Sequence, residues 1–102
     1  MTEQGKQDGG PLVVDLRDTR IETFDDLWDA LQVECDLPEW FGRNLDAWSD
    51  TLEGGISARI DDHPLIIIKL RSRGLFAPGR WEGEVFIDIS RESGAKVDII
   101  GN

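Results

Sequence analysis

The stretch Leu65-Ile66-Ile67-Ile68-Lys69-Leu70 contains the longest uninterrupted apolar run in the chain, and three of its six side chains are β-branched. Such a run favours a β-strand. Strands that are apolar at consecutive positions are typical of sheets covered on both faces, as in parallel sheets. The run is also far too short to cross a bilayer. We therefore expect Leu65–Leu70 to be a buried strand of a parallel sheet.

Two further segments predict strands on either side of this one in the sequence. Pro11–Leu16 (PLVVDL) comes after a Gly-Gly pair, and Lys96–Ile100 (KVDII) lies near the end of the chain. Long connections separate the three segments, as parallel neighbours require. The predicted fold is α/β, with a small three-stranded parallel sheet flanked by helices. We expect one domain over residues 11–102, preceded by a flexible tail over residues 1–10.

The first connection predicts a helix that begins after Thr23. Thr23 has the character of an N-cap, and Asp26 follows at the spacing of a capping box. Apolar residues then recur at helical spacing at Phe24, Leu27, Leu31 and Cys35. We expect Cys35 to be a small buried hydrophobic residue. Pro38 is expected to end the helix, because the residue before a proline disfavours the α conformation.

A second helix is predicted from the N-cap Asn44 to about Glu53, before the pair Gly54-Gly55. Its apolar stripe is formed by Leu45, Trp48 and Leu52. The acidic side chains of this helix lie on a different face, at positions i, i+4 and i+7. We call Asp46, Asp50 and Glu53 the acidic ridge. No Lys or Arg occurs at i±4 within the helix to compensate it.

The segment Glu84–Ser90 is ambiguous between strand and helix. Val85, Ile87 and Ile89 alternate as in a strand, and propensity favours this interpretation. Val85, Phe86 and Ile89 could instead form the buried stripe of a helix.

The net charge of the chain narrows the range of possible ligands and partners. The 102 residues carry a net charge of −10, which argues against direct binding of nucleic acid or anionic membranes. From Glu22 to Glu53, ten acids and the single base Arg43 give −9. This segment either forms solvated helix faces or steers a basic partner. Acids of the first helix such as Asp25 and Asp29 are expected to stay solvated. Three arginines later in the chain are interpreted as a solvated basic edge: Arg71, Arg73 and Arg80.

The single cysteine excludes an internal disulfide and a thiolate metal cluster, and it fits a reducing compartment. The N-terminal residues lack the apolar segment of a secretory signal. We expect a cytoplasmic protein that is monomeric when free and that needs no metal or other cofactor.

Residues 37–54 (LPEWFGRNLDAWSDTLEG) resemble the signature of the barstar family, which are intracellular inhibitors of secreted guanyl-preferring ribonucleases such as barnase. The family pattern reads Leu-Pro-Glu-aromatic-aromatic-Gly-x-Asn-Leu-Asp-Ala, followed by an Asp and a Leu-x-Gly. A weaker match covers the first helix, the strand after His63-Pro64, and Gly94 to Ile100. Together the two matches span nearly everything after Gly10. The resemblance implies a three-stranded parallel sheet flanked by helices. It also implies a helix over residues 84–93, which we adopt against propensity.

The resemblance implies an inhibitory surface on the acidic ridge and the loop before it. Asp50 matches the acid that enters the ribonuclease active site and meets its Arg and His groups, and Trp40 matches an aromatic that packs on the catalytic His. Phe41 is assigned to the core. The partner-binding residues are Trp40, Gly42, Asn44, Asp46, Asp50, Glu53 and Gly54.

The chain also departs from the family at several positions. Ser49 and Gly55 stand where barstar has aromatics, and the acid of the last helix corresponds to either Asp88 or Glu92. These differences bear on which partner is bound and how tightly.

Two other functions compete with inhibition of a basic, barnase-like ribonuclease. Asp46 and Asp50 could form a catalytic acid/base pair like that of glycosidases. Against this, both lie one turn apart on one exposed helix face, and no nucleophile, metal triad or phosphate loop accompanies them. We therefore predict no catalytic residues. The second alternative is a barstar-like interaction or immunity protein whose target is a different basic toxin or protein.

Overall fold

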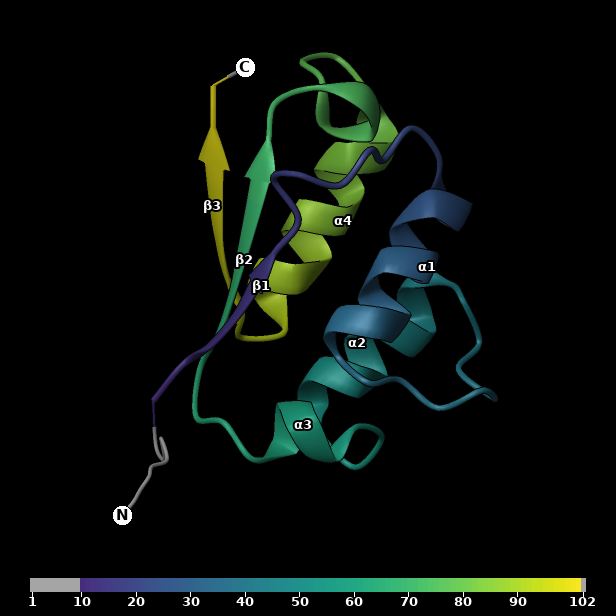
Figure 1. Ribbon diagram of the computed structural model, residues 1–102, viewed down its shortest axis with the longest axis vertical. Helices are drawn as coiled ribbons and strands as arrows, with labels where there is room; N and C mark the ends of the chain where they lie inside the picture. Colours follow the sequence, from purple (N-terminus) through teal and green to yellow (C-terminus); the bar gives the residue numbers. More distant parts are fainter. Residues whose placement is uncertain (1–9, 102) are drawn as a thin grey trace.

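A three-stranded parallel sheet forms one layer of the molecule (Figure 1). The computed structural model describes residues 10–101. The strands are β1 (Leu12–Asp15), β2 (Ile66–Arg71) and β3 (Lys96–Ile100), in the order β1-β2-β3. Val14 pairs with Ile68, and Ile68 with Val97, so three apolar side chains form one row across the sheet. The predicted α/β fold and the parallel sheet are confirmed; residues 1–9 of the expected tail lie outside the described residues.

The expectation that the central strand is covered on both faces is wrong. Along β2, buried side chains alternate with half-buried ones, and Ile66, Ile68 and Leu70 are the buried set. All the helices lie on the side of the sheet that these residues face (Figure 1). Ile67 and Lys69 lie on the other face and are only half-buried. Because the sheet has only three strands, one layer of helices is enough to complete the core. The apolar run of β2 therefore does not require a second layer of helices on the other face.

Helix α1 (Phe24–Glu34) begins with the predicted capping box. The Asp26 backbone N–H donates to Thr23 Oγ1 at 3.2 Å, and the Thr23 N–H donates back to Asp26 Oδ2 at 3.3 Å. Backbone donors at this helix end hold the pKa of Asp26 below its ordinary value. The helix ends with Cys35 as its C-cap, before Pro38, because Asp36 adopts the left-handed conformation with φ of 52°. The next residues then form an irregular loop.

Helix α2 (Leu45–Glu53) has the predicted N-cap, since the Ala47 N–H donates to Asn44 Oδ1 at 2.8 Å. The short helix α3 (Ala58–Asp61), capped by Ser57, was not predicted. Only Ile60 of this helix is buried, so its single turn carries no periodic apolar pattern in the sequence.

Helix α4 (Trp81–Glu92) confirms the helix that the family resemblance implied, and the strand that propensity favoured is wrong. It follows a short 3-10 turn, η2 (Gly74–Phe76), and its buried side includes Phe86 and Ile87. Gly83 lies so close to the preceding turn that an added Cβ would meet the Leu75 carbonyl oxygen at 2.3 Å. Helix packing at this point therefore depends on the absence of a side chain.

The core lies between the sheet and the helices and is rich in aromatic rings. Trp48 of α2 is fully buried and stacks on Phe86 of α4, with 5.8 Å between ring centroids. Its indole N–H donates to Ser90 Oγ at 2.9 Å, so the one polar atom of this side chain is satisfied. Cys35 is buried as expected, and burial raises the pKa of its thiol to about 12. No helix within residues 10–101 is long and apolar enough to cross a membrane.

Candidate protein-binding surface

The acidic ridge lies on the outer face of α2. Asp46, Asp50 and Glu53 are all exposed, while Trp48 and Thr51 on the opposite face are buried. This arrangement follows from the helical spacing, because positions i, i+4 and i+7 share one side of a helix. The structure thus brings the three predicted acids together on one surface.

No cation neutralises this ridge within the part of the chain that the structure describes. The salt bridges found among residues 10–101 do not include Asp46, Asp50 or Glu53. Among the described residues, only Ser49, with its hydroxyl 3.5 Å from Glu53 Oε2, is within hydrogen-bond distance of a ridge carboxylate. Repulsion between neighbouring carboxylates therefore remains in the free protein.

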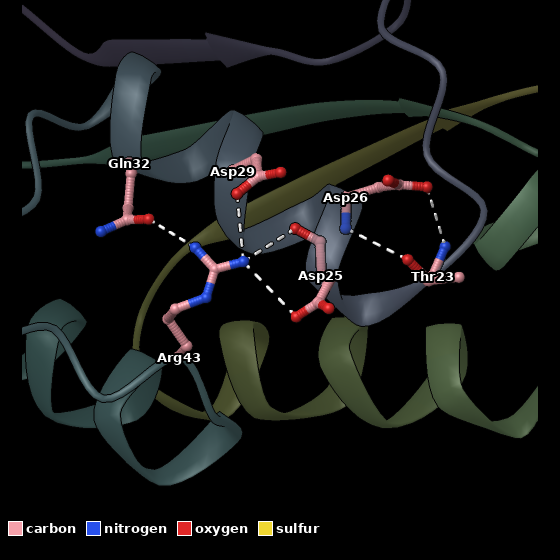
Figure 2. Close-up of polar contacts among 6 residues, drawn as sticks. All are labelled: Thr23, Asp25, Asp26, Asp29, Gln32 and Arg43. Atoms are coloured by element: carbon pink, nitrogen blue, oxygen red, sulfur yellow. Dashed lines mark hydrogen bonds and ion pairs between the residues drawn. The ribbon is translucent and has the colours of Figure 1, made fainter.

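Arg43, the only base between Glu22 and Glu53, extends toward α1 and binds its side chains (Figure 2). Its Nη1 donates to Gln32 Oε1 at 2.6 Å. Its Nη2 lies 3.0 Å from Asp29 Oδ1 and 3.4 Å from Asp25 Oδ1. Asp25 and Asp29 are exposed, as expected, but they are ion-paired and not simply solvated. Arg43 thereby neutralises acids of α1, and the acids of α2 have no ion-pair partner within residues 10–101.

Arg43 also holds the loop that precedes α2 against α1. Its backbone is in the left-handed conformation with φ of 52°, which is uncommon for a residue other than glycine. Its Nη2 also donates to the Asp25 carbonyl at 3.2 Å, so one guanidinium joins a side chain and the backbone of the other helix. Through both terminal nitrogens of the guanidinium group, Nη1 and Nη2, these contacts fix the loop relative to α1.

Gly42 and Asn44 connect this loop to the start of α2. Asn44 Nδ2 donates to the Gly42 carbonyl at 3.0 Å, while its Oδ1 accepts the bond that caps the helix. A Cβ at Gly42 would lie 3.2 Å from Asn44 Nδ2 and 3.3 Å from the Ala47 Cβ. Gly42 and Asn44, both predicted site residues, are exposed. Within the free protein, their contacts hold the loop against the start of α2.

The two neighbouring aromatics of the loop point in different directions. Phe41 is 4 % exposed and contacts Trp28 edge to face, with 5.8 Å between ring centroids. Trp40 is 69 % exposed. Anchoring by Phe41 leaves Trp40 as a large apolar side chain on the surface, at a position where burial against a partner yields much free energy.

The C-terminal end of α2 borders a cleft of about 440 Å³. Gly54 has φ of 117°, a conformation that favours glycine. Its backbone N–H donates to the Asp50 carbonyl, and the helix ends there. Gly55 then donates its N–H to the Asp61 carboxylate at 2.9 Å. Glu53, Gly54 and Asp61 are among the residues that line the cleft.

The end of α4 lies beside α2. The hydroxyls of Ser49 and Ser93 are 3.0 Å apart. Asp88 and Glu92 are both exposed on α4, and Glu92 directly precedes the serine that contacts α2. Of the two candidates for a further acid, Glu92 is thus the one adjacent in sequence to the contact with the ridge helix.

Sequence reasoning missed the structural residues of this surface. Arg43 was counted only as a lone base, and nothing local in the sequence indicated that it would contact Gln32, which lies 11 residues earlier. Ser49 was noted only as a missing aromatic, but it joins α2 to α4. Within residues 10–101, no three potential metal-ligating side chains cluster together.

Comparison with known proteins identifies a family. A family model described as Barstar (barnase inhibitor) matches residues 12–94, which include β1, β2, the loop before α2 and the acidic ridge. No curated protein matches the chain.

Proposed function

The chain belongs to the barstar family, and we propose that it inhibits a basic, barnase-type ribonuclease by covering the active site of that enzyme. The family is described as that of the barnase inhibitor. Asp46, Asp50, Glu53 and the exposed Trp40 are the partner-binding side chains in this proposal.

The proposal rests on an acidic ridge that pairs with no cation among residues 10–101, and on the exposed Trp40 in the loop that precedes the ridge helix. Carboxylates that are unpaired in the free protein need lose no internal ion pair before they bind a cation of a partner. An enzyme that binds RNA phosphates presents such cations in its active site. Charge complementarity then directs encounter and fixes orientation.

Asp50 has the central role because it lies between Asp46 and Glu53 on the ridge. A partner that covers the whole ridge desolvates the middle carboxylate most completely. There the carboxylate takes the place of an RNA phosphate, and a guanidinium contacts it through two parallel hydrogen bonds. Trp40 takes the place of a base, and Gly42, Asn44 and Gly54 shape the backbone around these side chains.

The direct test is inhibition of a secreted guanyl-preferring ribonuclease by the purified chain. We expect Asp50→Asn to weaken inhibition at least a hundredfold, about 2.7 kcal/mol, because it removes a charge that partner cations surround. The thermal midpoint of the free protein should be maintained or slightly raised, because the substitution relieves repulsion with Asp46.

Asp18→Asn is the matched control, since Asp18 is an exposed carboxylate in the turn after β1 and outside the ridge. It makes the same change in net charge, and inhibition should change less than threefold. Absence of inhibition by the native chain, or an equal loss in both variants, would overturn the proposal. Enzymatic turnover that is lost in Asp50→Asn would also overturn it.

A second candidate is an inhibitory or immunity protein for a different basic toxin. The departures at Ser49 and Gly55 favour a changed contact surface, because Ser49 is engaged with Ser93 and the Gly55 N–H with Asp61. Pull-down with the immobilised chain from cells that secrete a basic ribonuclease separates the candidates. Recovery of a basic protein without ribonuclease activity, through an interaction that depends on Asp50, favours the second.

A further inference from the structure

Arginines that are far apart in the sequence meet at the carboxyl ends of β1 and β2. Two loops, residues 16–22 and 71–76, border a cleft of about 300 Å³. Arg17 and Arg20 come from the first loop, whereas Arg71, the last residue of β2, and Arg73 come from the second segment. We call this the basic cleft. The cleft therefore lies at one edge of the sheet, where β1 and β2 both end.

The cleft concentrates positive charge in a protein that is otherwise strongly negative. Its lining holds four arginines and one acid, Glu22, for a formal charge of +3, whereas the whole chain carries −10. An anion is therefore repelled by most of the surface and attracted to this site. The sequence predicted only a solvated basic edge here, because Arg17 and Arg20 lie about fifty residues before Arg71 and Arg73.

The four arginines are not equally available to a ligand. Arg17 makes a bidentate contact with Asp15, at 2.8 and 2.6 Å, which lowers the pKa of Asp15 to about 2. Arg73 donates to the Arg17 carbonyl at 3.0 Å. Arg20 is 88 % exposed and lies 3.9 Å from Glu22. The guanidinium group of Arg71 has no hydrogen-bond or ion-pair partner among residues 10–101, so the side chains of Arg20 and Arg71 are the ones available to an anion.

Backbone and side-chain bonds hold the two loops of the cleft together. The Leu75 N–H donates to the Ile21 carbonyl at 2.9 Å. Gly74 has φ of 59°, and a Cβ there would meet the Ile21 carbonyl oxygen at 2.3 Å, so this close approach requires glycine. Arg80 donates to the Gly74 and Glu22 carbonyls at 3.2 and 3.3 Å. The cleft is thus formed before any ligand binds.

The floor of the cleft is apolar. Leu16, Ile21 and Phe76 line it and belong to the hydrophobic core. Guanidinium groups match the geometry of a phosphate, whereas an apolar floor contacts the organic part of a ligand. A volume near 300 Å³ is at the lower end of the range for small-molecule sites, and it is too small to enclose a macromolecule.

From this combination we infer that the basic cleft binds a phosphate monoester of a small organic molecule. Arg71 and Arg20 contact the phosphate, Arg17 and Arg73 form the wall, and Phe76 with its apolar neighbours contacts the organic group. The site is separate from the acidic ridge, since it involves neither α2 nor the loop before it.

Calorimetric titration of the full chain tests this inference, with ionic strength held constant by sodium chloride. The probes are adenosine monophosphate, ribose 5-phosphate, inorganic phosphate and adenosine. We expect saturable binding of the two esters with Kd of about 1 mM or below, at least fivefold weaker binding of inorganic phosphate, and none of adenosine. Binding of adenosine as strong as that of its monophosphate, equal binding of esters and inorganic phosphate, or no saturable ester binding overturns the inference.

The variants are Arg71→Gln and the more exposed Arg20→Gln, with Lys96→Gln as the control. Lys96 is an exposed cation at the start of β3, outside the cleft. Each cleft variant should weaken ester binding at least fivefold, and Lys96→Gln less than twofold. An equal effect of Lys96→Gln would mean that only net charge matters and would overturn the site. Ribonuclease inhibition should be unchanged in the cleft variants, so this test is independent of the proposed function.

Discussion

Ser90 shows how a single buried hydroxyl supports the helix that carries the ridge. It is fully buried, accepts the Trp48 indole N–H at 2.9 Å and donates to the Phe86 carbonyl at 2.8 Å. Ser90→Ala leaves the indole N–H buried without an acceptor, which costs about 1–3 kcal/mol. We expect the free energy of unfolding, measured by urea denaturation, to fall by that amount.

Ser93→Ala is the control for the loss of a serine hydroxyl from α4 and its C-cap, because Ser93 is half-buried and its partner Ser49 also contacts Glu53. Its loss of stability should stay below about 1 kcal/mol, since solvent can replace a half-exposed hydrogen bond. An equal loss in both variants would contradict the role assigned to the Trp48–Ser90 bond.

Among the secondary-structure elements, α1 and the loop that precedes α2 are joined by Arg43. Gln32→Ala removes the acceptor of Arg43 Nη1 without changing the charge of the protein. We expect it to lower the free energy of unfolding by about 1–2 kcal/mol, because a half-buried, charge-assisted hydrogen bond is lost. Inhibition should weaken about three- to tenfold, because the loop that carries Trp40 is held less firmly.

Val33→Ala provides the comparison, since Val33 is the next residue of α1 and is 75 % exposed. Stability and inhibition should both stay near the native values in that variant. If Gln32→Ala lowers stability but leaves inhibition unchanged, the loop is positioned by other contacts.

At the scale of the whole molecule, charge is segregated. The segment Glu22–Glu53 carries −9, while four of the arginines line the basic cleft outside it. We expect association with a basic ribonuclease to slow at least tenfold when salt is raised from about 0.05 M to about 1 M, where the screening length is only about 3 Å. Stopped-flow measurement of the association rate tests this; a rate constant independent of salt would argue against electrostatic steering.

The local sequence was sufficient to predict the parts of the fold that depend on neighbouring residues. The Thr23–Asp26 capping box, the Asn44 cap and the central strand each follow from a short pattern of side chains. The common face of Asp46, Asp50 and Glu53 follows from helical spacing alone. Their exposure follows because the opposite face carries Trp48, which must be buried.

Other features were decided only by tertiary packing. Residues 84–90 alternate like a strand, but Phe86 is surrounded by the rings of Trp28, Trp48 and Phe76, which requires the buried face of a helix. The direction of Arg43, and with it the absence of a cation on the ridge, depends on acceptors in α1. The basic cleft likewise brings together two loops that lie far apart in the chain. These contacts join residues of large sequence separation, and local periodicity and propensity contain no information about such pairs.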